Sequence, residues 1–342
     1  MASVKKKVGV FLINLGTPDS PNTRDVRKYL REFLMDRRVI DIPFVSRFLL
    51  INGIIAPFRA PKSAKVYKEL WQPEGSPLKF YGVRVKNLLQ QALDKNYHVS
   101  LGMRYQSPSI EEAAKEFEGK GFDEIIIIPL FPQYASASSG SAVEEAMRVI
   151  MQWELIPNIK VISNFFEHPL FIDSFVALGQ KYLAEREYDH ILFTYHGLPE
   201  RQILKSSIDN YCKLGDCCST YHSKNKLCYR AQCYATTRLL VEKLGIPEDK
   251  YTVCFQSRLG KTPWIKPYTD DIIKSLTDKG VKSVLAFSPS FIADCLETTI
   301  EGGVEYKELF EEKGGHHWQL VESLNDSTQW VDCLKDIVCK NT

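Results

Sequence analysis

Long apolar runs are missing from this 342-residue sequence. The nearest candidate, RFLLINGIIAPFR (residues 47–59), is interrupted by Asn52, Gly53 and Pro57, so it is too broken to span a bilayer. It could form a buried helix, the reading that base rates favour, or an apolar lip that lies on a membrane surface. The N-terminus also lacks a charged-then-apolar leader, so we expect a cytoplasmic, reducing location.

An excess of charge is missing too. The formal net charge is +2, and the only basic run is KKK at residues 5–7, so a nucleic-acid partner is not expected. Neither Gly-x-x-x-x-Gly-Lys-Ser/Thr nor Gly-x-Gly-x-x-Gly after a strand is present, which argues against a nucleotide cofactor.

What the sequence does contain is a steady alternation of strand-like runs and helix-periodic segments, typical of a parallel, doubly wound α/β fold. The strand-like runs are VGVFLINLG, HVSLGMRY, DEIIIIPLFP, IKVISNFF, HILFTYHG, YTVCFQS and KSVLAFSPS. Three of them recur in order, as in FLINLGTPD and LFTYHGLPE. The repeat predicts two similar Rossmann-like halves, residues 1–170 and 171–342, facing each other across a cleft.

His196 is the first candidate for chemistry. It ends the strand-like run ILFTYH, at the edge where open α/β sheets bind their ligands, and Gly197 follows directly. A lone histidine near a core is more often structural, but this position favours a functional one. A neutral imidazole there could accept a proton or bind a metal.

A row of carboxylates at helical spacing follows the last strand-like run: Asp294, Glu297, Glu301, Glu305 and Glu308. On a helix they would share one face. A solvated acidic face is the ordinary explanation, yet like charges four residues apart destabilise a helix unless a cation compensates. A metal or proton route is therefore the functional alternative. Gly302 and Gly303 interrupt the row, so a local π-bulge is expected.

Five of the nine cysteines fall within a short stretch: Cys212, Cys217, Cys218, Cys228 and Cys233. Disulfides are rare in a reducing compartment, so metal ligation is the better explanation. The spacing lacks the Cys-x2-Cys pair that is common in zinc sites, and four thiolates can equally hold a [2Fe–2S] cluster. One thiol is then spare, which we expect to be Cys217 or Cys218.

The chain resembles the ferrochelatase family. The similar segments occur in the family's order over most of the chain: FLINLGTPDS, GSPL, GMRYQSPSIEEA, PLFPQYASASSGSA, TYHGLPER, FQSRLGKTPWIKPYTDD and ADCLET. The resemblance implies a lyase that inserts Fe²⁺ into protoporphyrin IX with release of two protons, the last step of haem biosynthesis. A coproporphyrin III ferrochelatase and a non-catalytic iron–sulfur sensor on the same scaffold are the alternatives.

The resemblance also implies residue roles. His196 matches the active-site histidine and Glu297 the carboxylate across from it, so both are expected to meet the substrate iron. Asp294 and Glu301 match acids on a route for metal or protons. Arg104 and Tyr105 match the pair that contacts the porphyrin and its propionates. The remaining pocket positions are Tyr134, Trp264, Phe291, Leu15, Tyr67 and Ser76.

Three departures from the family's usual pattern matter. Cys295 stands where some members have histidine, which removes a ligand there. Leu15 stands where the coproporphyrin-using branch tends to carry tyrosine, which favours protoporphyrin. The cysteines occupy an insert at about residues 205–235, where many relatives have a short GDPY link. Some members hold a cluster in such a segment, which favours [2Fe–2S] over zinc.

Contact of the apolar lip with a membrane would be peripheral. The chain could be a monomer or a homodimer.

Overall fold

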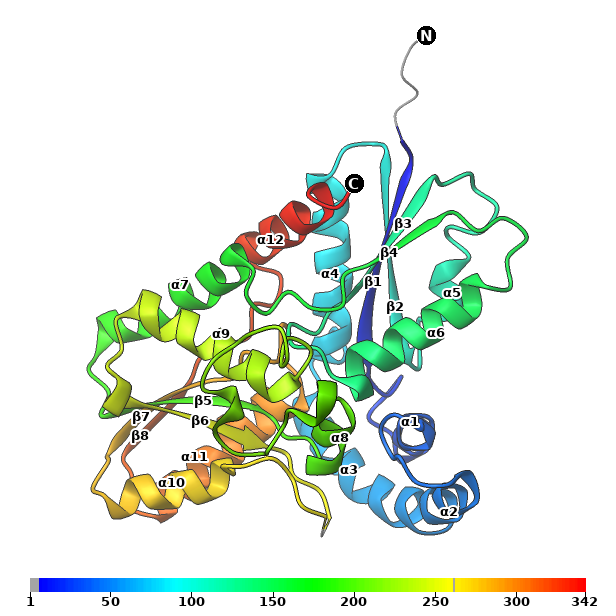
Figure 1. Cartoon of the computed structure of the whole chain (residues 1–342). Coiled ribbons are helices and arrows are strands. Elements are labelled where there is room, and N and C mark those ends of the chain that lie inside the picture. The colour runs from blue at the N-terminus through cyan, green and yellow to red at the C-terminus, as the bar shows by residue number, and fades with distance from the viewer. Residues whose placement is uncertain (1–5, 261) are drawn as a thin grey trace. The chain divides into compact units, whose positions relative to one another are not determined.

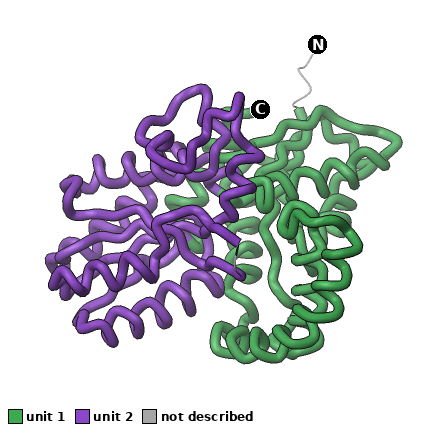
Figure 2. Tube along the Cα trace, turned by 60° about the horizontal axis from the view of Figure 1, so that its bottom comes forward, with its two compact units in different colours: residues 1–131, 135–164, 325–342 green, residues 132–134, 165–324 purple. Residues whose placement is uncertain are grey.

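The computed structural model describes residues 6–260 and 262–342, which form two compact units (Figure 2). One unit takes the chain as far as Phe131, then Ala135–Asn164 and Asn325–Thr342. The other takes Pro132–Tyr134 and Phe165–Leu324. The chain thus passes from the first unit to the second near the expected boundary at 170. The last residues differ from the expectation, because they return to the first unit.

The first unit is built on a parallel sheet of four strands in the order β2-β1-β3-β4 (Figure 1). Its strands are β1 (Val8–Gly16), β2 (Tyr97–Tyr105), β3 (Glu124–Pro129) and β4 (Asn158–Val161). Its helices before β4 are α1 (Thr23–Met35), α2 (Phe44–Leu49), α3 (Ala56–Leu70), α4 (Pro77–Ala92), α5 (Ile110–Ala114) and α6 (Ser141–Ile150). Strands β1 and β3 are buried along nearly their whole length, which explains their unbroken apolar sequences.

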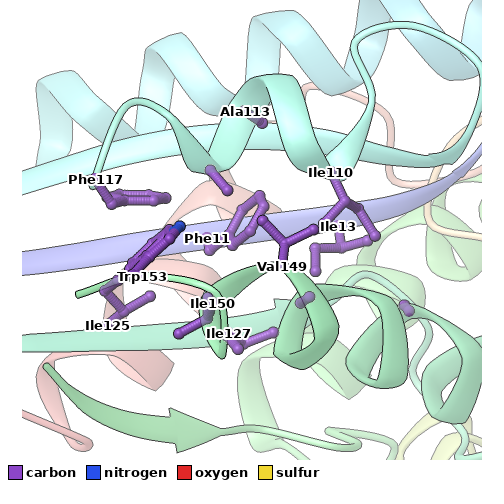
Figure 3. Close-up of a cluster of buried hydrophobic side chains, with 13 residues drawn as sticks. Phe11, Ile13, Ile110, Ala113, Phe117, Ile125, Ile127, Val149, Ile150 and Trp153 are labelled. Atoms are coloured by element: carbon purple, nitrogen blue, oxygen red, sulfur yellow. The ribbon is translucent and has the colours of Figure 1, made fainter. Parts of the chain in front are cut away.

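The core between this sheet and its helices can be followed in Figure 3. Phe11 on β1 and Ile127 on β3 are fully buried, and they pack with Ile150 on α6 and with Phe117. The rings of Phe11 and Phe117 lie 5.4 Å apart in a tilted arrangement. Alternate residues of β1 and β3 thus point to this face of the sheet, where they pack against the buried faces of α5 and α6.

The second unit repeats the same sheet with the order β6-β5-β7-β8. Its strands are β5 (His190–His196), β6 (Tyr251–Gln256), β7 (Ser283–Phe287) and β8 (His317–Leu320). Its α-helices are α7 (Pro169–Glu185), α8 (Glu200–Lys205), α9 (Tyr229–Leu244), α10 (Thr269–Asp278) and α11 (Tyr306–Glu312). The identical strand order confirms the predicted α/β class and its two similar halves.

A π-helix follows the third strand of each sheet. Ser136–Gly140 (η2) follows β3 and runs into α6, and Leu296–Glu305 (η6) follows β7 and runs into α11. The sequence predicted an α-helix with a local π-bulge, whereas the π winding extends over all ten residues of η6. Gly302 lies against β8, where its carbonyl accepts a 2.9 Å hydrogen bond from the Trp318 indole. A side chain at Gly302 would contact Leu320 at 3.2 Å, so the glycine permits this close approach.

The C-terminal helix α12 (Thr328–Cys339) belongs to the first unit and packs on α4. Polar contacts fix its ends: Arg84 pairs with Asp326 at 3.2 Å, and the Lys160 ammonium donates to the Asn341 carbonyl at 2.7 Å. Trp330, in the first turn of α12, is fully buried. The helical period marks this segment as a helix but carries no information on which sheet it covers.

The segment RFLLINGIIAPFR is not the buried helix that the sequence favoured. It runs through the end of α2, the π-helix Leu50–Ile55 (η1) and the start of α3. Large apolar side chains around it are exposed, namely Phe44, Val45, Phe48, Leu49, Ile54 and Phe58. Across the described residues, no helix has both the length and the apolar character that crossing a bilayer requires.

Candidate functional site

His196 ends β5 in register with Gln256, the last residue of β6. Its side chain is half-buried, and Nδ1 lies 2.6 Å from the Gly197 carbonyl oxygen. Because a carbonyl can only accept, Nδ1 carries the hydrogen in this contact. The Nε2 atom then holds the lone pair and is the nitrogen that can take a proton or a metal. Gly197 is required here, since a Cβ would lie 2.8 Å from the Gln256 carbonyl oxygen.

Two predicted pocket residues surround this imidazole. The rings of Trp264 and Phe291 each lie 6.4 Å from the His196 ring, centroid to centroid. Trp264 is fixed by its indole N–H, which donates to the Leu259 carbonyl at 2.9 Å, and by a bridge to Pro199. The structure therefore assembles the predicted histidine and two of its predicted aromatic neighbours in one place.

Glu297 is tied to the same pair of strands through Gln256. The Gln256 amide donates to the Glu297 backbone carbonyl at 2.9 Å, and Gln256 is also the register partner of His196. The neighbouring Cys295 is buried, and its thiol hydrogen-bonds the Glu297 carboxylate. Burial raises the pKa of Cys295, and the charge of Glu297 raises it further, so the thiol stays protonated and donates. Gln256 had no signal in the sequence, because its importance arises only from strand register.

The Glu301 carboxylate is fully engaged within the protein. It accepts from the Gln256 amide at 3.1 Å, from the Ser257 backbone N–H at 2.8 Å, from the Ser257 hydroxyl and from the Tyr306 hydroxyl at 2.8 Å. Ser257 has a φ of +63°, so this carboxylate holds a left-handed turn directly after β6. Asp294 likewise accepts from the Ser323 backbone N–H at 3.2 Å. Both acids thus have partners inside their own unit.

Arg104 and Tyr105, at the end of β2 in the first unit, converge on the buried Asp36. The Asp36 carboxylate accepts from the Arg104 guanidinium at 2.8 Å, from the Tyr105 hydroxyl at 2.9 Å and from the Ser141 hydroxyl. Burial alone would raise the pKa of Asp36. The hydrogen bonds from Ser141 and the Arg38 backbone, with the charge of Arg104, outweigh burial and lower that pKa. Asp36 and Ser141 hold these two predicted residues in place, and the sequence analysis did not single them out.

The other predicted pocket residues divide between the two units. Leu15 is half-buried on β1, Tyr67 is buried on α3, and Ser76 precedes α4, where its hydroxyl accepts from Thr17 at 2.9 Å. These three lie in the first unit. Tyr134 belongs to the second unit, where its backbone N–H donates to the Gln232 side chain at 2.6 Å.

The cysteine segment brings four thiols into one row of contacts. The sulfur atoms of Cys212 and Cys217 lie 4.0 Å apart, and hydrogen bonds continue the row from Cys217 to Cys218 and from Cys218 to Cys228. Cys233 is not part of this row and is fully buried within α9. All nine cysteines are free of disulfide bonds. Among the described residues, no three or more His, Cys, Asp or Glu side chains gather around a single metal position.

Electrostatics at this segment favour a thiolate at Cys228, whereas burial raises the pKa of Cys212 and the hydrogen bond to Cys228 raises the pKa of Cys218. Cys228 is the N-cap of α9, and the backbone N–H groups of Arg230 and Ala231 point at its sulfur. The hydrogen bond from Cys218 and then these amides lower the pKa of Cys228 to about 6. The Arg230 side chain is buried and cationic beside Cys217 and Cys218.

Comparison with known proteins gives one family. The family model described as Ferrochelatase matches residues 7–342. The chain is 46% identical over 330 residues to ferrochelatase of Legionella pneumophila (strain Lens), covering 96% of this chain and 98% of that one. It is 43% identical over 340 residues to ferrochelatase of Coxiella burnetii (strain Dugway 5J108-111), covering 98% and 94%.

Among solved structures, SirB from Bacillus subtilis with Fe³⁺ aligns with a TM-score of 0.52 at 12% identity, over 98% of this chain and 95% of that one. The sirohydrochlorin chelatase SirB from Bacillus subtilis subspecies spizizenii in complex with cobalt aligns with a TM-score of 0.53 at 10% identity, over 98% and 94%. These two likenesses show a shared fold.

Proposed function

We propose that His196 and Glu297 carry out metal insertion in this chain, which belongs to the ferrochelatase family and inserts Fe²⁺ into a porphyrin in haem synthesis. The observation that carries the proposal is the arrangement at the end of β5. A histidine with its Nδ1 committed to a carbonyl lies close to two aromatic rings, and Gln256 connects its strand to Glu297.

The chemistry needs a base and a weak metal site. A free-base porphyrin loses two N–H protons as iron enters, and the His196 Nε2 lone pair can accept one at a time. The half-buried imidazole releases the first proton to solvent before it takes the second. The Glu297 carboxylate supplies oxygen ligands, which bind Fe²⁺ more loosely than a set of thiolates would. The protonated Cys295 thiol beside it donates to the carboxylate and does not compete for the metal. Trp264 and Phe291 offer apolar faces for a flat tetrapyrrole.

Glu301 was predicted on a route for metal or protons, and its contacts favour a structural role. The Glu301 carboxylate accepts hydrogen bonds from three residues, so we propose that it fixes the turn after β6 and leaves proton acceptance to His196. In the first unit, the ion pair with Asp36 holds the Arg104 guanidinium in place, where it can meet a porphyrin carboxylate.

Anaerobic insertion assays test this assignment. Loss of porphyrin fluorescence on addition of Fe²⁺ should be fast in the wild type and at least about 100-fold slower in His196→Ala, the usual size of a general-base contribution. Glu297→Gln should raise the Fe²⁺ concentration at which the insertion rate is half-maximal. His98→Ala is the control, because His98 is a surface histidine paired with Glu116. Equal rates in His196→Ala and His98→Ala would refute the proposal.

We propose protoporphyrin IX as the porphyrin, because Leu15 provides an apolar side chain where a tyrosine hydroxyl would otherwise stand. Protoporphyrin carries two propionates and coproporphyrin four, so an apolar wall disfavours the more acidic ring. Parallel assays with the two porphyrins should give a higher kcat/KM for protoporphyrin IX. Leu15→Tyr should bring the kcat/KM values for the two porphyrins closer together. A higher kcat/KM for coproporphyrin III in the wild type would contradict this choice.

We also propose that the cysteine segment binds a [2Fe–2S] cluster through Cys212, Cys217, Cys218 and Cys228. A [2Fe–2S] cluster takes four protein thiolates, and these four thiols lie in one continuous row of contacts. Two ligands on one tetrahedral ion with bonds of about 2.3 Å lie roughly 3.8 Å apart, close to the 4.0 Å between Cys212 and Cys217. Cys233 then becomes the spare thiol, in place of Cys217 or Cys218.

The visible spectrum and the iron and sulfide content of purified protein test the cluster. Such a cluster supplies a one-electron redox centre and a cross-link within the segment. Cys212→Ser should abolish the brown colour, and Cys233→Ser should retain it. A colourless wild type that contains one zinc ion would refute the cluster, and loss of colour in Cys233→Ser would refute the ligand set.

Finally, we propose that the apolar lip at residues 47–59, extended by the exposed Phe44 and Val45 before it, rests on a membrane surface. Phe58 is 74% exposed and Leu49 63% exposed, and the next turns of α3 carry exposed cations at Arg59, Lys62, Lys65 and Lys68. Apolar side chains beside a basic face suit the boundary of an anionic bilayer. Co-sedimentation with phosphatidylglycerol vesicles should be lost in Phe58→Asp. Leu155→Asp, at another exposed apolar position, is the control; equal binding by all three proteins would contradict the proposal.

A further inference from the structure

We infer that Tyr229 is a positioning residue that connects the cysteine segment to the proposed catalytic histidine. Ligation of the thiols would then help to hold the His196 imidazole in place. The inference rests on the proposed roles of His196 and of the cysteine thiols. It concerns a contact that neither role requires.

Tyr229 is the first residue of α9 and directly follows Cys228, the N-cap. Its hydroxyl donates to the His196 backbone carbonyl at 2.9 Å and lies 3.1 Å from the Ser290 hydroxyl. The side chain is only 6% exposed, so water has little access to compete for this hydrogen bond. One peptide bond therefore separates a proposed cluster ligand from a residue that holds the backbone of the proposed base.

A second contact runs in parallel through Gln232, on the same turn of α9. Its amide donates to the Lys226 carbonyl at 2.8 Å, and its oxygen accepts from the Tyr134 backbone N–H at 2.6 Å. Gln232 is fully buried. The first turn of α9 thus holds the end of the cysteine segment and, at the same time, two residues of the predicted porphyrin site, His196 and Tyr134.

The cysteine segment depends on such cross-links because it has little regular structure of its own. Between α8 and α9 the chain forms only the 3₁₀ turns Ile208–Asn210 and Asp216–Cys218. Side chains of α9 hold it from one side: Arg230 donates to the Gly215 carbonyl at 2.6 Å, and Arg238 donates to the Cys218 carbonyl at 3.2 Å. Ligation of the thiols would supply the remaining constraint.

The expected consequence is a shared effect. When the thiols are not ligated, the segment loosens and the N-terminal turn of α9 frays, because helix ends have the fewest internal hydrogen bonds. The Tyr229 hydroxyl then leaves the His196 carbonyl, and the imidazole is no longer fixed from its backbone side. Removal of the hydroxyl alone should reproduce this effect on the histidine and leave the cluster in place.

A double-mutant experiment on the full chain tests the inference. Wild type, Tyr229→Phe, Cys212→Ser and the double variant are compared for visible absorption, kcat, porphyrin KM and the ¹⁵N shifts of the His196 ring. Tyr229→Phe should keep the cluster spectrum, change the ring shifts and lower kcat about 10-fold, the low end for loss of a partner that orients a functional histidine, with KM little changed. Cys212→Ser should change the same shifts and lower kcat. The double variant should be no worse than Cys212→Ser, because both changes break one connection.

Tyr195→Phe is the matched control. The Tyr195 hydroxyl is also buried and also contacts α9, through Thr237 at 2.8 Å. Its removal should lower stability but leave kcat and the His196 shifts unchanged. Unchanged ¹⁵N shifts of the His196 ring in Tyr229→Phe would overturn the connection. So would losses of kcat in Tyr229→Phe and Cys212→Ser that multiply in the double variant. In either case, an intact cluster in the wild type would still uphold the proposed cofactor. A wild type without a cluster would overturn the proposed cofactor and, with it, the dependence of His196 on ligated thiols.

Discussion

Replacement of Asp36 by asparagine probes the ion pair that fixes Arg104. The Asp36 side chain is 4% exposed and that of Arg104 18% exposed, so this pair is largely shielded from solvent. Asparagine has the same shape, but it exchanges one acceptor oxygen for a donor and removes the charge. Oδ1 accepts from the Arg38 backbone N–H at 2.7 Å, and Oδ2 accepts from Arg104, Tyr105 and Ser141.

The magnitude follows from this geometry. An asparagine side chain can satisfy the Arg38 amide or the three other donors, but in either orientation its NH₂ group faces a donor. It also leaves a largely buried guanidinium without its counter-charge. Removal of one partner of a buried ion pair costs about 3–5 kcal/mol, so we expect the free energy of unfolding to fall by that amount. Arg104 should also become mobile, which should weaken porphyrin binding.

The dependence on pH has a definite sign. The folded-state pKa of Asp36 lies below that of an unfolded aspartate, so its contribution is fully present above pH about 4 and is lost as the pH falls further. The difference in unfolding free energy between wild type and Asp36→Asn should therefore shrink in acid.

Urea denaturation at neutral pH and near pH 3, followed by circular dichroism, measures both effects. Asp173→Asn is the matched control, because Asp173 pairs with Lys243 on the surface, where both side chains are more than 40% exposed. Such a pair contributes about 1 kcal/mol or less. If Asp36→Asn cost no more than Asp173→Asn, Asp36 would not hold Arg104 in the way described.

Three further predictions concern other parts of the fold. Gly16→Ala should destabilise the protein far more than Gly75→Ala in urea titrations. Both glycines have positive φ, 105° and 112°, but only at Gly16 would a Cβ collide with another atom, the backbone oxygen of Tyr105. Equal losses of unfolding free energy would contradict this steric argument. Glu301→Gln should lower the thermal midpoint and kcat together, because the turn after β6 loses its carboxylate; a normal midpoint with altered kcat would instead restore Glu301 as a relay. His190→Gln should make the unfolding free energy fall less steeply in acid. Burial and nearby lysines lower the pKa of His190 to about 4, so its contribution to stability is lost as the pH falls from about 6.5. An unchanged dependence of the unfolding free energy on pH would refute this.

The sequence was sufficient for the architecture because both of its signals are local. Strand-like runs separated by periodic helices predict a parallel sheet wherever they occur, and the repeat of Gly-x-Pro turns predicts two of them. The position of His196 at the end of a strand was predictable for the same reason, since the end of a strand can be read from the chain. The structure places the rings of Trp264 and Phe291 near it, and its catalytic role stays a prediction.

Other features depend on contacts that no local pattern encodes. Asp36 reaches Arg104 across 68 residues, and Gln256 matters only because its strand lies in register with His196. The π winding of η6 reflects packing of Gly302 against β8, not helix propensity. The exposed apolar lip has the composition of a buried helix, and only tertiary structure distinguishes the two.

Single-turnover insertion in His196→Ala tests the central claim most directly. Protoporphyrin is bound first, its affinity is measured from fluorescence, and Fe²⁺ is then mixed in without oxygen. We predict that the variant binds porphyrin within a few-fold of the wild type and inserts iron at least about 100-fold more slowly, with partial recovery on addition of free imidazole. Insertion at the wild-type rate with normal porphyrin affinity would show that His196 does not accept the porphyrin protons.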